Sequence, residues 1–550
     1  MILSKWWTTL IDMLKEIHND KISGHDRPIV LEGLVGIMGR PEWTLACQDS
    51  IPGLDAIPSP EHGRRTSSIS SASSPSILMP TEKVTIGENI RNAFEQNLAE
   101  QMTLVIEKMS QRTTPASLVS FCGKACAYAF FFCPGIADLL VSLWHVKPAL
   151  MKRVLRANNM ESPFRFPAGA GTMRSCLPAT LSSLSFMSLR DATTKLRQAA
   201  HVPDTVKHLD WHGYWLKRWS GKDSDLFYAF VKQYHILLAS CLPKETPKKD
   251  WLFAPGVLPV YAQILANLDG TIHRQSAGVA MLPVKDKDGR LDRAAITFND
   301  IDVSADAFAP AAINATKMMS DNRLITLLKD FLPHKQQSFP PASYLFAEGF
   351  CDILKAAACH TSVYDHHACF TLCDFLEEAI AIIGKFEANT SEPPLLDWKF
   401  WMDVFTRILR TENTLTQIRL YALLFTIWPL IDARTRWKEY LCLEILLEPA
   451  QFETSFSHYC PLVRTYYHRL LCWRIARCDD KLEVDLYVGQ RHSLIVRTTN
   501  MNTEGFFAPS RKGFASSIIP SEHYSNKHRM QVDYFWKPNL ARQHPIDAYL

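Results

Sequence analysis

Apolar residues recur every three or four positions along most of the chain. Between residues 84 and 484, segments such as NIRNAFEQNLAEQMTLVIEKMS and WKFWMDVFTRIL show this spacing, which is typical of amphipathic α-helices. Proline, asparagine, aspartate or glycine separates each segment from the next. Strand-like alternation is scarce, and its best candidate is residues 294–308 (AAITFNDIDVSADAF). The pattern therefore predicts an all-α protein.

The order of the helical segments predicts the architecture only coarsely. No strict internal repeat is visible, so the expected arrangement is an irregular helical array or an armadillo- or HEAT-like α-solenoid. Residues 84–484 form the predicted main helical domain, and residues 1–49 contribute the N-terminal helices of the same body. Residues 485–550 lose the helical period and are predicted to be a mostly disordered C-terminal extension.

The first helix is predicted from MILSKWWTTLIDMLKEI at the N-terminus. Asp12 and Lys15 interrupt any signal-peptide core, so the segment is interpreted as an amphipathic core helix. The apolar positions at helical spacing are Leu3, Trp6, Trp7, Leu10, Leu14 and Ile17.

Residues 50–83 interrupt the helical pattern with a Ser/Pro-rich insertion. It has few large apolar residues and cannot bury enough surface to order itself, so disorder is predicted. Within it, Arg64 and Arg65 precede Ser67 in RRTSS, a pattern that basophilic kinases read. Ser67 is therefore a candidate phosphorylation site.

Composition narrows the choice of function class. The chain has 550 residues, 47% of them apolar and 21% charged, which is ordinary for a folded protein with a large core. The net charge of +4 is spread along the chain, so nucleic acid is not an expected partner. No GxGxxG or GxxxxGK[ST] motif occurs. Without a secretory signal, the 14 cysteines are expected to be free thiols in a reducing compartment.

Residues 123–144 (GKACAYAFFFCPGIADLLVSLW) are the most apolar stretch. Their length approaches the roughly 20 residues that a bilayer requires. Pro134 and Gly135 interrupt the middle, and Asp138 would lie in hydrocarbon, so a buried helical hairpin is preferred over a membrane span. The second apolar stretch, Leu420–Ile431, is expected to be too short to span and has Arg419 at its edge.

A metal site is one hypothesis for the region from Cys351 to Cys373. Cys369, Cys373 and His366 have spacing that could supply three zinc ligands. The region has no paired CxxC motif, and its cysteines alternate with core-type residues, so helix packing is the preferred interpretation. No metal or cofactor is expected.

The segment FSHYCPLVRTYYHRLLCWRIARC (456–478) combines cysteines, histidines, arginines and aromatics. Pro461 fits the first turn of a helix. At 100° per residue, the apolar side chains fall on one broad arc and the cysteines do not converge. The arginines are divided between the faces, which disfavours nucleic-acid binding. The segment is predicted to be a packed helix whose structural motif is Pro461, Arg464, Tyr467, Leu470, Leu471, Trp473 and Arg474. Trp473 is expected to be buried on the apolar arc.

Two long stretches, residues 111–144 and 436–477, resemble a large fungal family known only as a domain of unknown function. The motif PLVRTYYHRLLCWR is the most specific resemblance, and RPEW at Arg40–Trp43 also fits. Some members of that family are labelled membrane proteins. The resemblance implies a helical body, and it carries no catalytic residues.

The sequence therefore favours a helical scaffold or interaction protein with unidentified protein partners. Its expected location is the cytoplasm or the periphery of an endomembrane. One alternative is an integral membrane protein anchored through residues 123–144, and a second is a metalloprotein that uses the Cys351–Cys373 cluster. No catalytic constellation is identifiable, so an enzyme is not expected.

Overall fold

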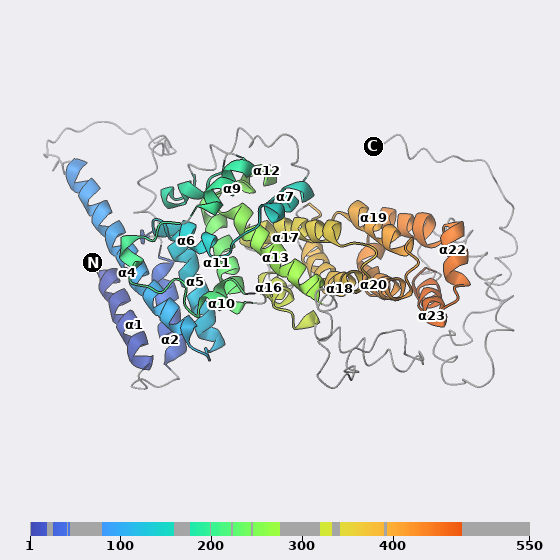
Figure 1. Cartoon of the computed structure of the whole chain (residues 1–550), viewed down its shortest axis with the longest axis horizontal. Coiled ribbons are helices and arrows are strands. Elements are labelled where there is room, and N and C mark those ends of the chain that lie inside the picture. The colour runs from blue at the N-terminus through green and yellow to red at the C-terminus, as the bar shows by residue number, and fades with distance from the viewer. Residues whose placement is uncertain are drawn as a thin grey trace, which may run out of the picture. The chain divides into compact units, whose positions relative to one another are not determined.

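A computed structural model describes twelve stretches of the chain. They are residues 2–18, 26–40, 42–43, 80–158, 176–186, 188–198, 200–221, 224–243, 246–274, 319–332, 341–389 and 393–475. Every regular element within them is a helix, which confirms the all-α prediction (Figure 1). A solenoid arrangement stays a prediction. The strand candidate at 294–308, Ser67 and the extension at 485–550 lie outside the described residues.

The chain divides into two compact units. Unit 1 comprises Met1–Leu282, Asn314–Thr361 and Ile382–Leu396, and unit 2 comprises Pro283–Ile313, Ser362–Ala381 and Asp397–Leu550. The larger helices of unit 1 are α1 (Ile2–His18), α2 (Arg27–Met38), α4 (Pro80–Ser110), α5 (Ala116–Phe132), α6 (Ile136–Ser142), α7 (Pro148–Ala157), α9 (Leu189–Arg197), α11 (Asp225–Cys241), α13 (Val257–Ile272), α16 (Arg323–Phe331) and α17 (Pro341–His360). Short helices are η2 (Ala179–Leu184), η3 (Asp204–Val206), α10 (Leu216–Trp219) and α12 (Lys248–Trp251).

Unit 2 is built around a smaller set of helices. They are α19 (Trp398–Leu409), α20 (Thr414–Asp432), α21 (Thr435–Tyr440), α22 (Pro449–Phe456) and α23 (Pro461–Leu470). Two π-helical segments, η5 (Leu441–Leu446) and η6 (Leu471–Ile475), directly continue α21 and α23. The helix α18 (His366–Ala388) begins in unit 2 and ends in unit 1.

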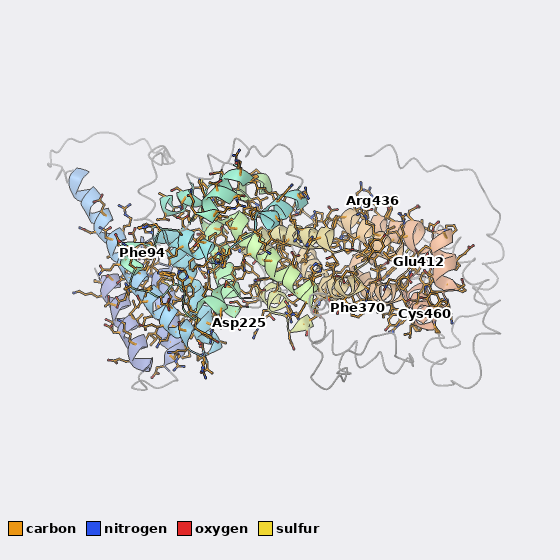
Figure 2. The ribbon with its side chains drawn as sticks, viewed as in Figure 1. Phe94, Asp225, Phe370, Glu412, Arg436 and Cys460 are labelled. Carbon is orange, nitrogen blue, oxygen red and sulfur yellow. The ribbon has the colours of Figure 1, made fainter. Side chains whose placement is uncertain are left out.

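Aromatic side chains fill the core where α1, α2 and α4 meet. Trp7 is fully buried and packs edge-on against Trp43 and Phe94, with ring centroids 5.8 and 5.5 Å away. Phe94 lies on α4 (Figure 2). Its Nε1 donates to Gln101 Oε1 at 2.8 Å, and Trp43 Nε1 donates to the Ile37 carbonyl oxygen at 3.0 Å. The indole N–H groups are thus satisfied, as burial requires.

The centre of unit 1 depends on a close approach between α5 and α11. Gly123 of α5 lies against Ala229 and Phe230 of α11, where an added Cβ would sit 2.5 Å from the Ala229 Cβ. Residues of α5 beyond this point, including Phe130 and Phe131, are almost all buried. The glycine therefore sets the distance at which the two helices bury their apolar faces.

We expect Gly123→Ala to lower the free energy of unfolding by about 1–3 kcal/mol, because the methyl group overlaps α11. Gly36→Ala in α2 is the matched control, since its Cβ meets no atom within 4 Å. That variant should gain up to about 1 kcal/mol from helix propensity. Denaturant unfolding of both variants measures the difference. Equal effects of the two substitutions would contradict the close packing of α5 on α11.

Candidate functional site

Helix α23 contains most of the motif singled out from the sequence. Pro461 occupies its first turn, directly after Cys460, and Val463, Tyr467 and Leu470 are its buried residues. Tyr467 Oη donates to the Leu446 carbonyl oxygen at 2.5 Å. Burial raises the pKa of Tyr467 well above its usual value, so the phenol stays a donor.

Arg464 and Leu471, the next two motif residues, have structural roles. The Arg464 guanidinium donates to the carbonyl oxygens of His458 and Tyr459 in the turn before α23. Leu471 is buried at the start of η6. The Arg464 contacts fix the start of α23 against the turn before it through backbone acceptors.

The prediction that Trp473 is buried is wrong, because its side chain is 38% exposed. The sequence projection assumed 100° per residue, whereas Leu471–Ile475 is π-helical and rotates less per residue.

The same π-helical turn brings the side chains of Arg469 and Arg474 to the ring of Phe425. Their guanidinium carbons lie 4.7 and 4.1 Å from the Phe425 centroid on α20. The sequence had divided the arginines between faces.

Helix α20 is longer than the sequence indicated. It begins at Thr414 and has 19 residues, whereas the sequence interpretation treated only Leu420–Ile431 as apolar and too short. Among the described residues it is the one helix long and apolar enough to cross a membrane, and 61% of that window is buried within the protein. Core helices of soluble proteins can be equally long and apolar, so length and composition do not show whether α20 crosses a membrane.

Arg419 lies within α20 as part of a buried ion network. Its side chain is 9% exposed, its Nε contacts Asp374 Oδ1, and its Nη2 lies 2.6 Å from Glu377 Oε2. Both carboxylates belong to α18. Burial alone would lower the pKa of Arg419, but the two carboxylates outweigh it and raise that pKa. The cation is therefore fixed in place by two helices of the same protein.

The apolar stretch at residues 123–144 forms two helices joined by a turn. Helix α5 ends at Phe132 and α6 begins at Ile136, with Gly135 at φ 75° between them. This is the hairpin that the sequence favoured. Asp138 lies in the first turn of α6, where a carboxylate suits the helix dipole. Burial raises the pKa of Asp138, against the opposing effects of Ser183 and Lys195.

Three cysteines of the Cys351–Cys373 region, Cys351, Cys369 and Cys373, are buried in the helices α17 and α18. The described residues contain no group of three or more His, Cys, Asp or Glu side chains that could hold a metal ion. Cys369 Sγ donates to the Ser362 carbonyl oxygen at 3.2 Å. Burial raises the pKa of Cys369 to about 11 and that of Cys373 to about 12.

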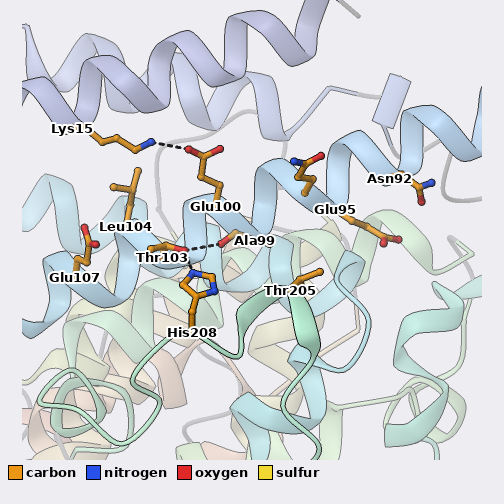
Figure 3. Close-up of a pocket in the computed structure, with 11 residues that line it drawn as sticks. Lys15, Asn92, Glu95, Ala99, Glu100, Thr103, Leu104, Glu107, Thr205 and His208 are labelled. Atoms are coloured by element: carbon orange, nitrogen blue, oxygen red, sulfur yellow. Dashed lines mark hydrogen bonds and ion pairs between the residues drawn. The ribbon is translucent and has the colours of Figure 1, made fainter.

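A groove of about 800 Å³ runs along α4 in unit 1 (Figure 3). It is lined by Lys15, Asn92, Glu95, Gln96, Ala99, Glu100, Thr103, Leu104, Glu107, Thr205 and His208. Lys15 Nζ donates to Glu100 Oε1 at 2.7 Å, and Thr103 Oγ1 lies 3.2 Å from His208 Nε2. Several of its polar groups are thus engaged with one another.

The exposed face of α1 and α2 carries an apolar stripe that sequence reasoning missed. The stripe comprises the exposed Ile2 and Trp6 and the half-buried Leu10 and Met13 of α1, together with the exposed Ile29 of α2. Trp6 was expected in the core but is 62% exposed, and Ile2 and Ile29 are 73% and 68% exposed. Leu10 packs toward Gly33 of α2, 3.2 Å from the position that a Cβ would occupy there. Spacings of four, four and three residues place the α1 members on one face.

Comparison with known proteins shows that part of this chain is similar to a family without an assigned activity. Residues 350–475 match a family model described as "Protein of unknown function (DUF1765)", a range that contains α23 and the Arg419 network. The predicted resemblance to a family of unknown function is therefore confirmed. No solved structure matches the chain.

A curated relative in Schizosaccharomyces pombe (strain 972 / ATCC 24843) is named "UPF0592 membrane protein C7D4.03c". It is 25% identical over 401 residues, which cover 70% of this chain and 42% of that protein. The chain therefore spans less than half the length of the relative. Its name confirms that some related proteins are labelled membrane proteins.

We expect Arg419→Met to lower the free energy of unfolding by about 3–5 kcal/mol, because Asp374 and Glu377 would remain buried without their cation. Arg407→Met on α19 is the matched control, since that arginine is exposed, and should change stability by about 0.5 kcal/mol or less. Chemical denaturation measures both. A loss of similar size in the two variants would contradict the buried network.

The carboxyl group of Glu95, which lines the groove, is expected to make the stability of the protein depend on pH. Burial raises its pKa above the ordinary 4.5, against the opposing charge of Arg91. The native state therefore holds the Glu95 proton more tightly than the unfolded state does. The protonated carboxyl group stabilises the native state at low pH, and this contribution is lost as pH rises through the raised pKa. Relative to the natural protein, Glu95→Gln should gain stability between about pH 4 and pH 7. Melting temperatures across this range provide the test, and a constant difference would refute it.

Proposed function

We propose that this chain is a helical interaction protein that associates peripherally with a membrane through the apolar stripe of α1 and α2. The observation that carries the proposal is the exposure of Ile2, Trp6 and Ile29 on two adjacent helices. Single exposed apolar residues are common, but several on one face indicate an interaction surface. Tryptophan is enriched at membrane–water interfaces, where its ring meets both apolar and polar surroundings.

Other features of the stripe fit a surface contact better than insertion. On α1 the stripe lies between the exposed polar positions Lys5, Thr9 and Glu16 and the buried face that Trp7 fixes in the core. A helix of this kind lies in the plane of the interface with one apolar edge among the lipid headgroups. The name of the curated relative also supports membrane association.

The integral alternative requires either residues 123–144 or α20 to leave the protein core. Helix α5 would separate from α11, which contacts it closely at Gly123. Helix α20 would carry Arg419 away from Asp374 and Glu377, and an arginine at the centre of a spanning helix costs about 2.5–3.5 kcal/mol. Both costs favour peripheral binding. The described residues contain no group of three or more potential metal ligands that would support the metalloprotein alternative.

We expect Trp6→Ser to weaken binding to phosphatidylcholine vesicles about tenfold, because an aromatic side chain no longer enters the interface. Tyr364→Ser is the control, since Tyr364 is 86% exposed but lies outside the stripe. Both variants should keep the melting temperature of the natural protein. Vesicle co-sedimentation measures the binding.

Alkaline carbonate extraction separates the proposal from its alternative, because it releases peripheral proteins and leaves spanning proteins in the pellet. Release is expected here. Retention, or equal vesicle binding by the Trp6 and Tyr364 variants, would overturn the peripheral contact at the stripe.

A further inference from the structure

We propose that the apolar stripe of α1 and α2 selects zwitterionic membrane surfaces with loosely packed lipids, as in strongly curved bilayers, rather than anionic surfaces. This inference rests on the peripheral contact proposed above and names the kind of lipid surface that the contact recognises. Its central observation is that large apolar side chains stand out from a surface on which carboxylates outnumber lysine and arginine.

The N-terminal half of α1 supplies the apolar part of this surface. Ile2, Trp6 and Leu10 are four residues apart and share one face of the helix. Ile2 and Trp6 are exposed, whereas Trp7 on the neighbouring face is fully buried in the core. The helix is therefore already folded and fixed before it meets a membrane, and its contact consists of a few large side chains that must find room between lipid headgroups.

Short hydroxyl side chains form most of the polar flank beside these residues. Thr8 and Thr9 are exposed, and their hydroxyl groups donate to the carbonyl oxygens of Ser4 and Lys5 at 3.0 and 2.9 Å. These donors are thus satisfied within the helix and do not require a headgroup phosphate. Lys5 is the one charged residue in the sequence from residue 2 to residue 10.

Carboxylates outnumber cations along the edges of the stripe. Lys5 shares the polar flank of α1 with Asp12 and Glu16, and all three side chains are exposed. On α2, Glu32 is exposed one turn after Ile29. Amphipathic helices that bind anionic lipids carry lysine and arginine on their polar face. This surface has one cation against three carboxylates, so an anionic membrane offers it no electrostatic gain.

The remaining basic residues of the two helices do not change this balance. Lys15 Nζ lies 2.7 Å from Glu100 Oε1, and Arg40 Nε lies 3.8 Å from Glu42 Oε2. Arg27 is half-buried and precedes the exposed isoleucine of α2 by two residues, which places it about 200° away around the helix. The stripe therefore has no basic border that could attract acidic headgroups.

Without that attraction, binding depends on how easily apolar side chains enter the lipid surface. Tightly packed headgroups of a flat bilayer leave little space for an indole ring. Strong curvature spreads the headgroups of the outer leaflet and exposes acyl chains, which accept tryptophan and isoleucine side chains. Interfacial helices of low charge are sensitive to curvature for this reason. The arrangement at the stripe therefore favours lipid packing, rather than lipid charge, as the property that is recognised.

The test measures flotation of the full chain with small, strongly curved phosphatidylcholine vesicles and with large ones, each with and without phosphatidylserine. Binding should be about tenfold tighter to the small vesicles. Phosphatidylserine should change the affinity by less than about twofold, because the surface carries no excess of cations. Trp6→Ser should remove the preference for small vesicles, and Tyr364→Ser should keep it.

A charge reversal tests the electrostatic part separately. Glu16→Lys places a second cation beside the stripe, so adding phosphatidylserine should now strengthen binding about fivefold. Glu453→Lys is the matched control. Glu453 is exposed on α22, and its reversal alters the net charge equally without altering the surroundings of the stripe. Circular dichroism melting checks that each variant is folded.

The outcomes separate this inference from the peripheral contact itself. Equal binding to small and large vesicles, weakened by Trp6→Ser, would overturn the selection for packing and leave the contact in place. A strong gain with phosphatidylserine in the natural protein would overturn the selection against charge. Absence of binding to every vesicle would overturn both proposals. If sedimentation then showed a dimer that Trp6→Ser dissociates, the stripe would belong to an interface with a second copy of the chain.

Discussion

The buried ion network of Arg419 is the interaction that constrains unit 2 most strongly. A guanidinium that is only 9% exposed is tolerated because two carboxylates from α18 accept its charge. Helices α18 and α20 are therefore held in one register, since any slip along either axis would separate a buried cation from its anions. Helix α23 packs on the same α20, and its Tyr467 ring lies 5.4 Å from that of Tyr421.

The same network bears on whether the apolar helix α20 is a core helix or a membrane-spanning helix. Length and composition would allow this helix to cross a bilayer, but a paired arginine and a largely buried window are features of a core helix. In unit 1 the close contact at Gly123 has an equivalent effect on α5, because it commits an apolar face to α11. The membrane contact that we propose uses neither helix. It uses Ile2, Trp6 and Ile29, which the core leaves exposed.

Much of the fold was predictable because helical periodicity is a local property of the sequence. The all-α class, the Pro134–Gly135 turn and the start of α23 at Pro461 all follow from spacing and from the backbone preferences of proline and glycine. Family resemblance was also readable in the sequence, and it was confirmed at residues 350–475. These features require no knowledge of which helix packs on which.

The exposed sites were not predictable, because they depend on contacts between distant segments. Trp6 and Trp7 are adjacent and equally apolar, yet only Trp7 finds Trp43 and Phe94, and Trp6 is left at the surface. Trp473 and the two arginines were misplaced because a regular 100° period was assumed across a π-helical turn. The sequence alone determined that the chain forms amphipathic helices, because the period of apolar residues is local. Tertiary packing decided which aromatic residues stay exposed and which charges converge, because burial is shared among helices that are far apart in the chain.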